Sequence, residues 1–211
     1  MDRPARLLHQ AAAHCLLYPG GDGWHERMHL VRRALEAEPH PAAAALGPFL
    51  EHAAATPAAA LGEHYVAVFD FKTRHSLYLS WWADGDTRRR GRSLLAFKEA
   101  YRARGLLFSG EELPDFLPAV LEFTAATADA GLLARHRPGL ELLRLALAEH
   151  GTPYAAVVAA VSATLPGPTP KDRAEARALA LAGPPQESVG LDDLPPYAHL
   201  TQLPLITGDS R

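Results

Sequence analysis

Proline and glycine divide this chain into segments that are rich in alanine and leucine and poor in β-branched residues. Within the segments, apolar residues recur three or four positions apart, as they do on the buried face of a helix. In the first segment Leu8, Ala11 and Cys15 share one such face, and Pro19-Gly20-Gly21 ends it. The pattern predicts an all-α protein.

The helix boundaries are predicted from the same proline and glycine residues and from capping residues. Asp86 or Thr87 is a favourable N-cap for a helix that runs through Arg104, and Gly105 suits the position after its end. Proline is favoured in the first turn of a helix, so we expect Pro114 to begin another. The predicted helices cover residues 4–18, 24–38, 87–104 and 114–131, and three more begin at Pro138, Pro153 and Pro170. Two others lie between residues 38 and 70: one carries Leu46, Phe49, Leu50 and Ala53, and the next carries Leu61, Tyr65, Val68 and Phe69.

Length and composition are consistent with one folded domain. The chain has 211 residues, of which 48% are hydrophobic, and this is enough for a single core. Residues 183–211 are rich in proline and have no helical period, so we expect a tail without a core of its own. The predicted organisation is a single-domain helical bundle over residues 1–182, followed by an irregular C-terminal tail over residues 183–211.

Charge, cysteine content and hydropathy argue against several classes of protein. The 21 basic and 24 acidic residues give a formal net charge of −3, which does not favour a nucleic-acid-binding protein. Cys15 is the only cysteine, so no internal disulfide can form and a reducing compartment is expected. The N-terminus lacks a signal-peptide pattern, and no run reaches the roughly 18 apolar residues of a membrane span. We expect a cytoplasmic protein without direct membrane insertion.

One short motif is compatible with an enzyme. His25, Glu26 and His29 form an H-E-x-x-H sequence, which on a helix can bind zinc with the glutamate as general base. The intervening Arg27 does not fit the buried helix of a metalloprotease, and no third ligand is marked. A zinc-dependent hydrolase is therefore kept only as an alternative. We expect a protein that is not an enzyme, with no catalytic residue, no metal and no cofactor.

A dense basic cluster lies at the start of the helix expected after Thr87. Its first turns, where the helix dipole disfavours positive charge, carry Arg88, Arg89, Arg90 and Arg92. An anionic partner would offset that effect, and two sources are open: an external anion, or an ion-pair network within the protein. The candidate internal partners are Asp84, Asp86, Glu111, Glu112 and Asp115.

Large amphipathic side chains fill the connection between residues 70 and 85. Tyr78, Trp81 and Trp82 lie there beside Leu77, away from any regular helix face. They can be buried plugs of the core, or they can line a recognition groove, since tryptophan and tyrosine are enriched at binding hot spots. The sequence leaves both interpretations open.

Several distinct motifs follow one another in the middle of the chain. They are FD (Phe69-Asp70), SLYL (Ser76–Leu79), GDTRRRG (Gly85–Gly91), FKEAYRARG (Phe97–Gly105), ELPDFLP (Glu112–Pro118) and VLEF (Val120–Phe123), with ESVGL (Glu187–Leu191) in the tail. Through these motifs the chain resembles the nitrate reductase molybdenum cofactor assembly chaperones, the NarJ family. That family lies within the wider group of TorD/DmsD-type redox-enzyme maturation chaperones.

This resemblance implies an all-helical fold of the TorD/DmsD type and a chaperone rather than an enzyme. Members of the wider group bind the N-terminal, twin-arginine-type peptide of a molybdoenzyme subunit. The implied partner here is the catalytic (alpha) subunit of respiratory nitrate reductase. It would be held in its apo form in the cytoplasm while the molybdenum cofactor is inserted, before membrane attachment. A maturation chaperone for another molybdoenzyme is an alternative.

The residues and the resemblance together predict a groove for an amphipathic client helix. We expect its lining to include Tyr65, Phe69, Leu77, Tyr78, Trp81, Trp82, Glu112, Pro114, Asp115 and Phe116. Asp115, with Glu112 nearby, is expected to pair with basic residues of the client. Asp115→Ala should therefore weaken client binding and leave thermal melting nearly intact. The charged rim is expected to consist of Asp86, Arg88, Arg90 and Arg92.

Two positions depart from the family pattern. Phe116 stands where the wider group has histidine, so no role that needs an imidazole can lie there. In the tail, Gly190-Leu191 is followed by Asp192-Asp193-Leu194-Pro195 rather than by the expected Glu-Pro-Phe. The role of the tail is therefore open.

Overall fold

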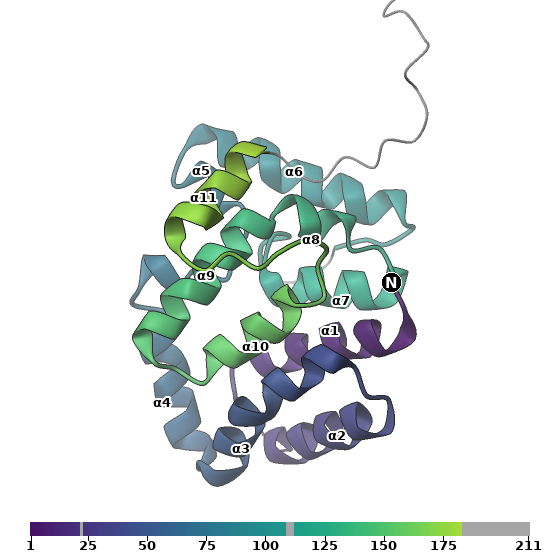
Figure 1. The fold of residues 1–211 in the computed structure, drawn as a ribbon, viewed down its shortest axis with the longest axis vertical. Helices are drawn as coiled ribbons and strands as arrows, with labels where there is room; N and C mark the ends of the chain where they lie inside the picture. Colours follow the sequence, from purple (N-terminus) through teal and green to yellow (C-terminus); the bar gives the residue numbers. More distant parts are fainter. Residues whose placement is uncertain (22, 109–111, 183–211) are drawn as a thin grey trace, which may run out of the picture.

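The computed structural model of this chain describes residues 1–21, 23–108 and 112–182 (Figure 1). Within these residues the regular secondary structure is helical, and the one β contact is an isolated antiparallel bridge between Tyr78 and Phe116. The all-α prediction is confirmed. The α-helices are α1 (Arg3–Leu16), α2 (Trp24–Ala37), α3 (Gly47–Ala55), α4 (Ala58–Phe69), α5 (Trp81–Asp84), α6 (Arg88–Ala103), α7 (Leu117–Thr127), α8 (Gly131–Arg135), α9 (Arg137–His150), α10 (Tyr154–Ser162) and α11 (Arg173–Ala182). Two 3-10 helices are η1 (Pro41–Leu46) and η2 (Thr73–His75).

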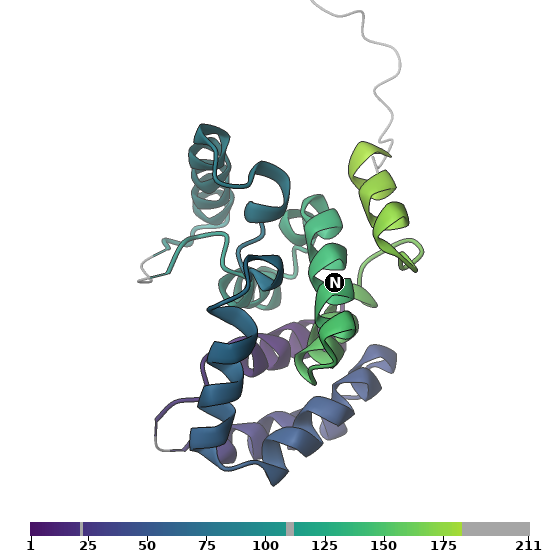
Figure 2. The ribbon, with the colours of Figure 1, turned by 90° about the vertical axis from the view of Figure 1, so that its left-hand side faces the viewer.

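Helix α1 lies in the middle of the fold (Figure 1). It packs along α7 and α10, and it also contacts α2. Helices α2 and α3 lie at one end of the molecule, and α5 and α6 lie at the opposite end (Figure 1). Helix α9 packs against α10 and α11 and also contacts α5 (Figure 2). Among the described helices, none combines the length and the hydrophobicity that crossing a membrane requires.

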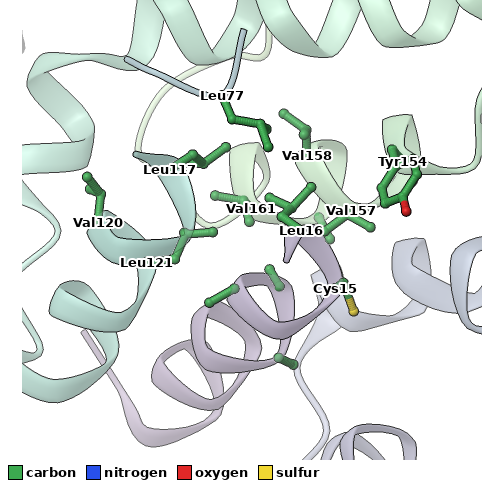
Figure 3. Packing of buried hydrophobic residues seen from close by; sticks show 14 of the residues in the cluster. Cys15, Leu16, Leu77, Leu117, Val120, Leu121, Tyr154, Val157, Val158 and Val161 are labelled. Carbon is green, nitrogen blue, oxygen red and sulfur yellow. The ribbon is translucent and has the colours of Figure 1, made fainter. Parts of the chain in front are cut away.

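The core is built from the apolar helix faces. Leu16, Leu121 and Val161 are fully buried where α1, α7 and α10 meet (Figure 3). Leu77, from the connection between α4 and α5, reaches the same cluster beside Leu117 (Figure 3). Burying a leucine side chain contributes about 1.5–3 kcal/mol. Leu77 therefore anchors an otherwise irregular connection to the bundle.

The structure corrects the predicted start of α7, which begins at Leu117 and not at Pro114. The N–H of Leu117 donates to the carbonyl of Leu77 at 2.8 Å. In the other direction, the N–H of Leu79 donates to the carbonyl of Asp115 at 3.0 Å. The carbonyl of Asp115 and the N–H of Leu117 are thus bonded to the connection before α5, so the chain before Leu117 runs along this connection rather than in a helix.

Smaller differences concern other helix ends and short helical turns. Helix α11 begins at Arg173 rather than at Pro170 because Asp172 caps it, with Oδ1 accepting the N–H groups of Ala174 and Glu175. The sequence pattern does not predict α5, α8, η1 or η2, since each is too short to show a hydrophobic period. The predicted tail over residues 183–211 lies outside the described residues.

A buried ionic network joins α9 to the segment that leads to α11. Glu141 is fully buried and accepts hydrogen bonds from Arg144 Nε at 2.7 Å and from the hydroxyl of Ser162. Arg137 Nε lies 3.4 Å from Glu141 Oε1, and its guanidinium donates to the carbonyls of residues 166–168. Two arginines therefore neutralise one buried carboxylate and hold the chain after α10 against α9.

A buried histidine links α1 to two other elements. The ring nitrogens of His9 lie 2.6 Å from the hydroxyl of Thr124 in α7 and 2.8 Å from that of Thr164 after α10. Burial lowers the pKa of His9 from 6.5 to about 4, with a smaller contribution from His40. His9 is therefore neutral in the folded protein at pH values where it binds a proton in the unfolded chain.

We expect His9 to reduce the free energy of unfolding by about 1–2 kcal/mol between pH 7 and pH 5. Its folded pKa lies below its unfolded pKa, so the unfolded chain takes up the extra proton and acid favours unfolding. Urea denaturation at both pH values measures the effect. The difference in the free energy of unfolding between pH 7 and pH 5 should become smaller in His9→Gln. It should stay unchanged in the control His29→Gln, which alters an exposed residue of α2. If this difference were as large in His9→Gln as in the wild type, His9 would not be the source of the pH dependence.

Candidate functional site

Three segments that are far apart in the sequence meet beside α4 and α7. The connection before α5 pairs with the residues before α7 through the Tyr78–Phe116 bridge. From α6, the hydroxyl of Tyr101 donates to the carbonyl of Pro114 at 2.6 Å. The backbone around residues 77–80 and 114–117 is thus fixed by hydrogen bonds from both sides.

Asp115 holds two of these segments together. Its side chain is fully buried, and Oδ2 accepts hydrogen bonds from the N–H (3.1 Å) and the hydroxyl (2.6 Å) of Ser80. Arg90 Nη2 lies 3.8 Å from the same oxygen, and Arg90 Nε donates to the Ser80 hydroxyl at 3.3 Å. The prediction that Asp115 pairs with a client does not agree with this position, because no part of its side chain reaches solvent. Asp115 is a positioning residue.

A pocket of about 290 Å³ opens next to Asp115, and we call it the aromatic pocket. Its walls come from the end of α4, the connection before α5 and the residues before α7. The rings of Tyr65 and Phe69 lie 4.8 Å apart, and those of Tyr78 and Phe116 lie 5.5 Å apart. The lining residues are Tyr65, Phe69, Asp70, Lys72, Thr73, Ser76, Leu77, Tyr78, Trp81, Glu112 and Phe116.

A second pocket, of about 500 Å³, adjoins the first and shares Glu112 and Phe116 with it. We call it the leucine pocket. It lies between α7 and residues 106–108, where Leu107 is 81% exposed. Its other lining residues are Leu17, Tyr101, Leu106, Phe108, Pro118, Ala119, Glu122, Phe123 and Ala126. Because the two pockets share a wall, they form one paired groove with Glu112 and Phe116 at its centre.

Seven of the ten predicted groove residues line the aromatic pocket: Tyr65, Phe69, Leu77, Tyr78, Trp81, Glu112 and Phe116. The other three do not line either pocket of the groove. Trp82 packs on α9 so closely that a Cβ at Gly139 would lie 2.8 Å from Trp82 Cβ. Pro114 is buried, as is Asp115. Of the two adjacent tryptophans, Trp81 therefore faces the groove and Trp82 packs on the bundle.

Opposite charges flank the aromatic pocket. The guanidinium of Arg90 lies over the rings of Tyr78 and Trp81, 5.6 Å and 5.9 Å from their centroids. The carboxylate of Glu112 accepts a hydrogen bond from the Tyr78 hydroxyl at 2.6 Å. Desolvation raises the pKa of Tyr78, and the bond to Glu112 raises it further. Tyr78 is therefore a protonated donor at neutral pH, and Glu112 keeps acceptor capacity on the groove side.

The arginine cluster divides into two parts. Arg90 is partly buried and has the internal partners Asp115 and Ser80, so it fits the ion-pair interpretation. The remaining members are exposed and form no ion pair with any described residue: Arg88, Arg89 and Arg92. Asp86 is exposed as well, and Glu111 lies outside the described residues. Of the predicted rim, Arg90 lies over two residues that line the groove, Tyr78 and Trp81.

The leucine pocket is not predicted from the sequence. The signal that could have revealed it is Gly105-Leu106-Leu107-Phe108, an apolar run that follows α6 without a helix face to bury it. Tyr101 and Phe123 form the base of the pocket behind this run. The ring of Tyr101 lies 5.8 Å from that of Phe108 and 4.9 Å from that of Phe123.

The H-E-x-x-H motif does not assemble a metal site. His25 Nε2 lies 3.0 Å from the carbonyl of Thr56, while Glu26 and His29 are exposed. Within residues 1–21, 23–108 and 112–182, no three His, Cys, Asp or Glu side chains gather where they could share an ion. Cys15 is fully buried, and burial raises the pKa of its thiol. The described residues therefore contain no set of side chains that could bind the zinc ion of a hydrolase.

The fold and the paired groove define an all-α protein with a largely apolar groove on its surface. Residues 35–160 match the family described as the nitrate reductase delta subunit, a span that includes every groove residue except Leu17. The chain belongs to this family. The match confirms the resemblance carried by the motifs between Phe69 and Phe123.

Relatives of known description are similar to part of the chain. The nitrate reductase-like protein NarX of Mycobacterium tuberculosis, in strains CDC 1551 and H37Rv, is 50% identical over 104 residues, which is 47% of this chain and 16% of NarX. The probable nitrate reductase molybdenum cofactor assembly chaperone NarJ of Bacillus subtilis is 44% identical over 78 residues, which is 37% of this chain and 42% of NarJ. The chain thus spans less than half the length of these relatives.

Proposed function

We propose that this protein is a chaperone for the assembly of nitrate reductase and that it assists insertion of the molybdenum cofactor. Membership of the nitrate reductase delta subunit family supports the proposal, as does the similarity to the Bacillus subtilis assembly chaperone. The observation that carries it is the paired groove, in which aromatic and aliphatic side chains remain open to a partner. Residues 1–182 are the folded chaperone domain, and residues 183–211 are a tail.

The client is the apo catalytic subunit of respiratory nitrate reductase, and its N-terminal region enters the groove as an amphipathic helix. The apolar face of that helix packs on Trp81 and Phe69 in the aromatic pocket and on Leu107 in the leucine pocket. Glu112 lies between the pockets and pairs with a basic residue of the client. Asp70 supplies a second carboxylate at the aromatic pocket.

No covalent step is required of the protein. Its side chains bind the client segment and exclude water from it, while Asp115 and Arg90 hold the groove wall in place. The cofactor is cargo of the client enzyme. The chaperone keeps the catalytic subunit open in the cytoplasm until that cargo is inserted and releases it before membrane attachment.

Trp81→Ala should weaken binding of the purified apo catalytic subunit about tenfold, since a covered aromatic side chain contributes about 1–2 kcal/mol to an interface. Trp81 is only partly buried, so its removal should cost less than about 1 kcal/mol of folding stability. Biolayer interferometry measures the affinity. Leu30→Ala, which removes a 57% exposed residue of α2, is the control.

Two outcomes would contradict the proposal in different ways. If the wild-type chain does not bind the apo subunit, the proposed client is wrong. If it binds and Trp81→Ala binds equally well, the client site lies outside the groove.

A further inference from the structure

A third pocket lies on another part of the surface, between α5, α9 and α11, and we call it the basic pocket. Its volume is about 620 Å³, and it shares no lining residue with the paired groove. Figure 2 shows α5 and α11 on opposite sides of α9. The apolar part of its lining includes Leu79, Trp82 and Leu142. A segment that fills this pocket must therefore carry apolar side chains.

The charges around this apolar lining are positive. Arg74 of η2, Arg135 of α8 and Arg177 of α11 line the pocket and are exposed, and no acidic side chain of the described residues lines it. None of these three arginines forms an ion pair in the part of the chain that the structure describes, whereas Arg173 pairs with Glu149 at 2.7 Å. The pocket thus suits a segment that is both apolar and acidic.

The chain carries an apolar and acidic segment shortly after α11, the last helix that lines the pocket. Leu181, near the end of α11, lines the pocket and is 91% exposed. Residues 183–211 contain four acidic residues and one basic residue, whereas residues 1–182 contain equal numbers of both. The run Leu191-Asp192-Asp193-Leu194 places two carboxylates between two leucines.

We propose that residues 187–194 dock into the basic pocket of their own chain. Leu191 and Leu194 cover the apolar lining, and Asp192 and Asp193 pair with the arginines at its edge. The ten residues from Ala182 to Asp192 can span up to about 33 Å, and α11 is about 15 Å long, so the segment can return along α11. The covalent link supplies a high effective concentration, so individually weak ion pairs suffice.

Hydrogen–deuterium exchange of the whole chain, followed by mass spectrometry, tests the docking. Amides of residues 187–194 should exchange about tenfold more slowly than in a free peptide of the same sequence. The double variant Asp192→Asn/Asp193→Asn should lose this protection. The control Asp209→Asn, which also removes a negative charge from residues 183–211, should retain it.

The arginine side of the contact is tested in the same way. Arg135→Gln/Arg177→Gln should abolish the protection of residues 187–194, and Arg88→Gln/Arg89→Gln, which alters exposed arginines of α6, should not. Absence of protection in the wild type, or its persistence in both Asp192→Asn/Asp193→Asn and Arg135→Gln/Arg177→Gln, would overturn the proposal. Protection that grows with protein concentration would also overturn it, since the segment would then bind a second copy.

Discussion

Asp115→Ala is expected to lower the free energy of unfolding by about 3 kcal/mol. The substitution removes the acceptor for the N–H and the hydroxyl of Ser80, which is itself fully buried and has no access to water. It also takes away the carboxylate nearest to Arg90, which lies over the aromatic pocket. This expectation replaces the one drawn from the sequence, in which the variant kept its stability.

Urea denaturation of three variants checks the role of Asp115. Asp115→Asn keeps the shape and one acceptor oxygen but removes the charge, so its loss should be smaller than that of Asp115→Ala. Asp86→Ala removes an exposed carboxylate just before α6, the helix that carries Arg90. It should change the free energy of unfolding by less than about 0.5 kcal/mol. A loss in Asp115→Ala no greater than in Asp86→Ala would show that Asp115 does not hold the groove wall.

Glu141→Ala is expected to be at least as damaging, with a loss of about 3–5 kcal/mol. Arg137, which is only 4% exposed, would lose the carboxylate that neutralises it, and Arg144 and Ser162 would lose their acceptor. The same change loosens the segment after α10, because Arg137 holds the carbonyls of residues 166–168.

The matched control for Glu141 lies on the same helix. Glu149 pairs with Arg173 at 2.7 Å, but both side chains are well exposed, so Glu149→Ala should cost less than about 1 kcal/mol. Thermal unfolding followed by circular dichroism compares the two variants. Equal shifts in melting temperature would mean that the Glu141 network adds nothing beyond a surface ion pair.

Most of the helical fold is predictable because its signals are local. Apolar spacing gives α1 and α2. Thr87 lies at the N-cap of α6 although its side chain makes no capping hydrogen bond, and Gly105 has the positive φ, 73°, that its place after α6 requires. The start of α7 is not predictable in this way. Pro114 is an acceptable first-turn residue, but hydrogen bonds from distant residues hold this segment outside the helix: Leu77 and Leu79 bond to Leu117 and Asp115, and Tyr101 bonds to the carbonyl of Pro114.

In the candidate site, too, the features that depend on contacts between distant residues are not predictable from the sequence. The aromatic connection indicates a groove because its side chains have no helix face to join, and seven predicted residues do line the aromatic pocket. The directions of Trp81 and Trp82 depend on how α5 packs against α9, and a four-residue helix gives no period from which to predict them. Likewise, the burial of Asp115 is set by Ser80, 35 positions away in the sequence.

The central claim is that the paired groove binds the N-terminal region of a nitrate reductase catalytic subunit. Calorimetric titration of the 211-residue chain with a peptide of about fifteen such residues, enough for four helical turns, tests it directly. We predict saturable one-to-one binding that Glu112→Gln weakens about threefold and that Glu99→Gln, at an exposed site on α6, leaves unchanged. No binding by a chain that circular dichroism shows to be folded would contradict the claim.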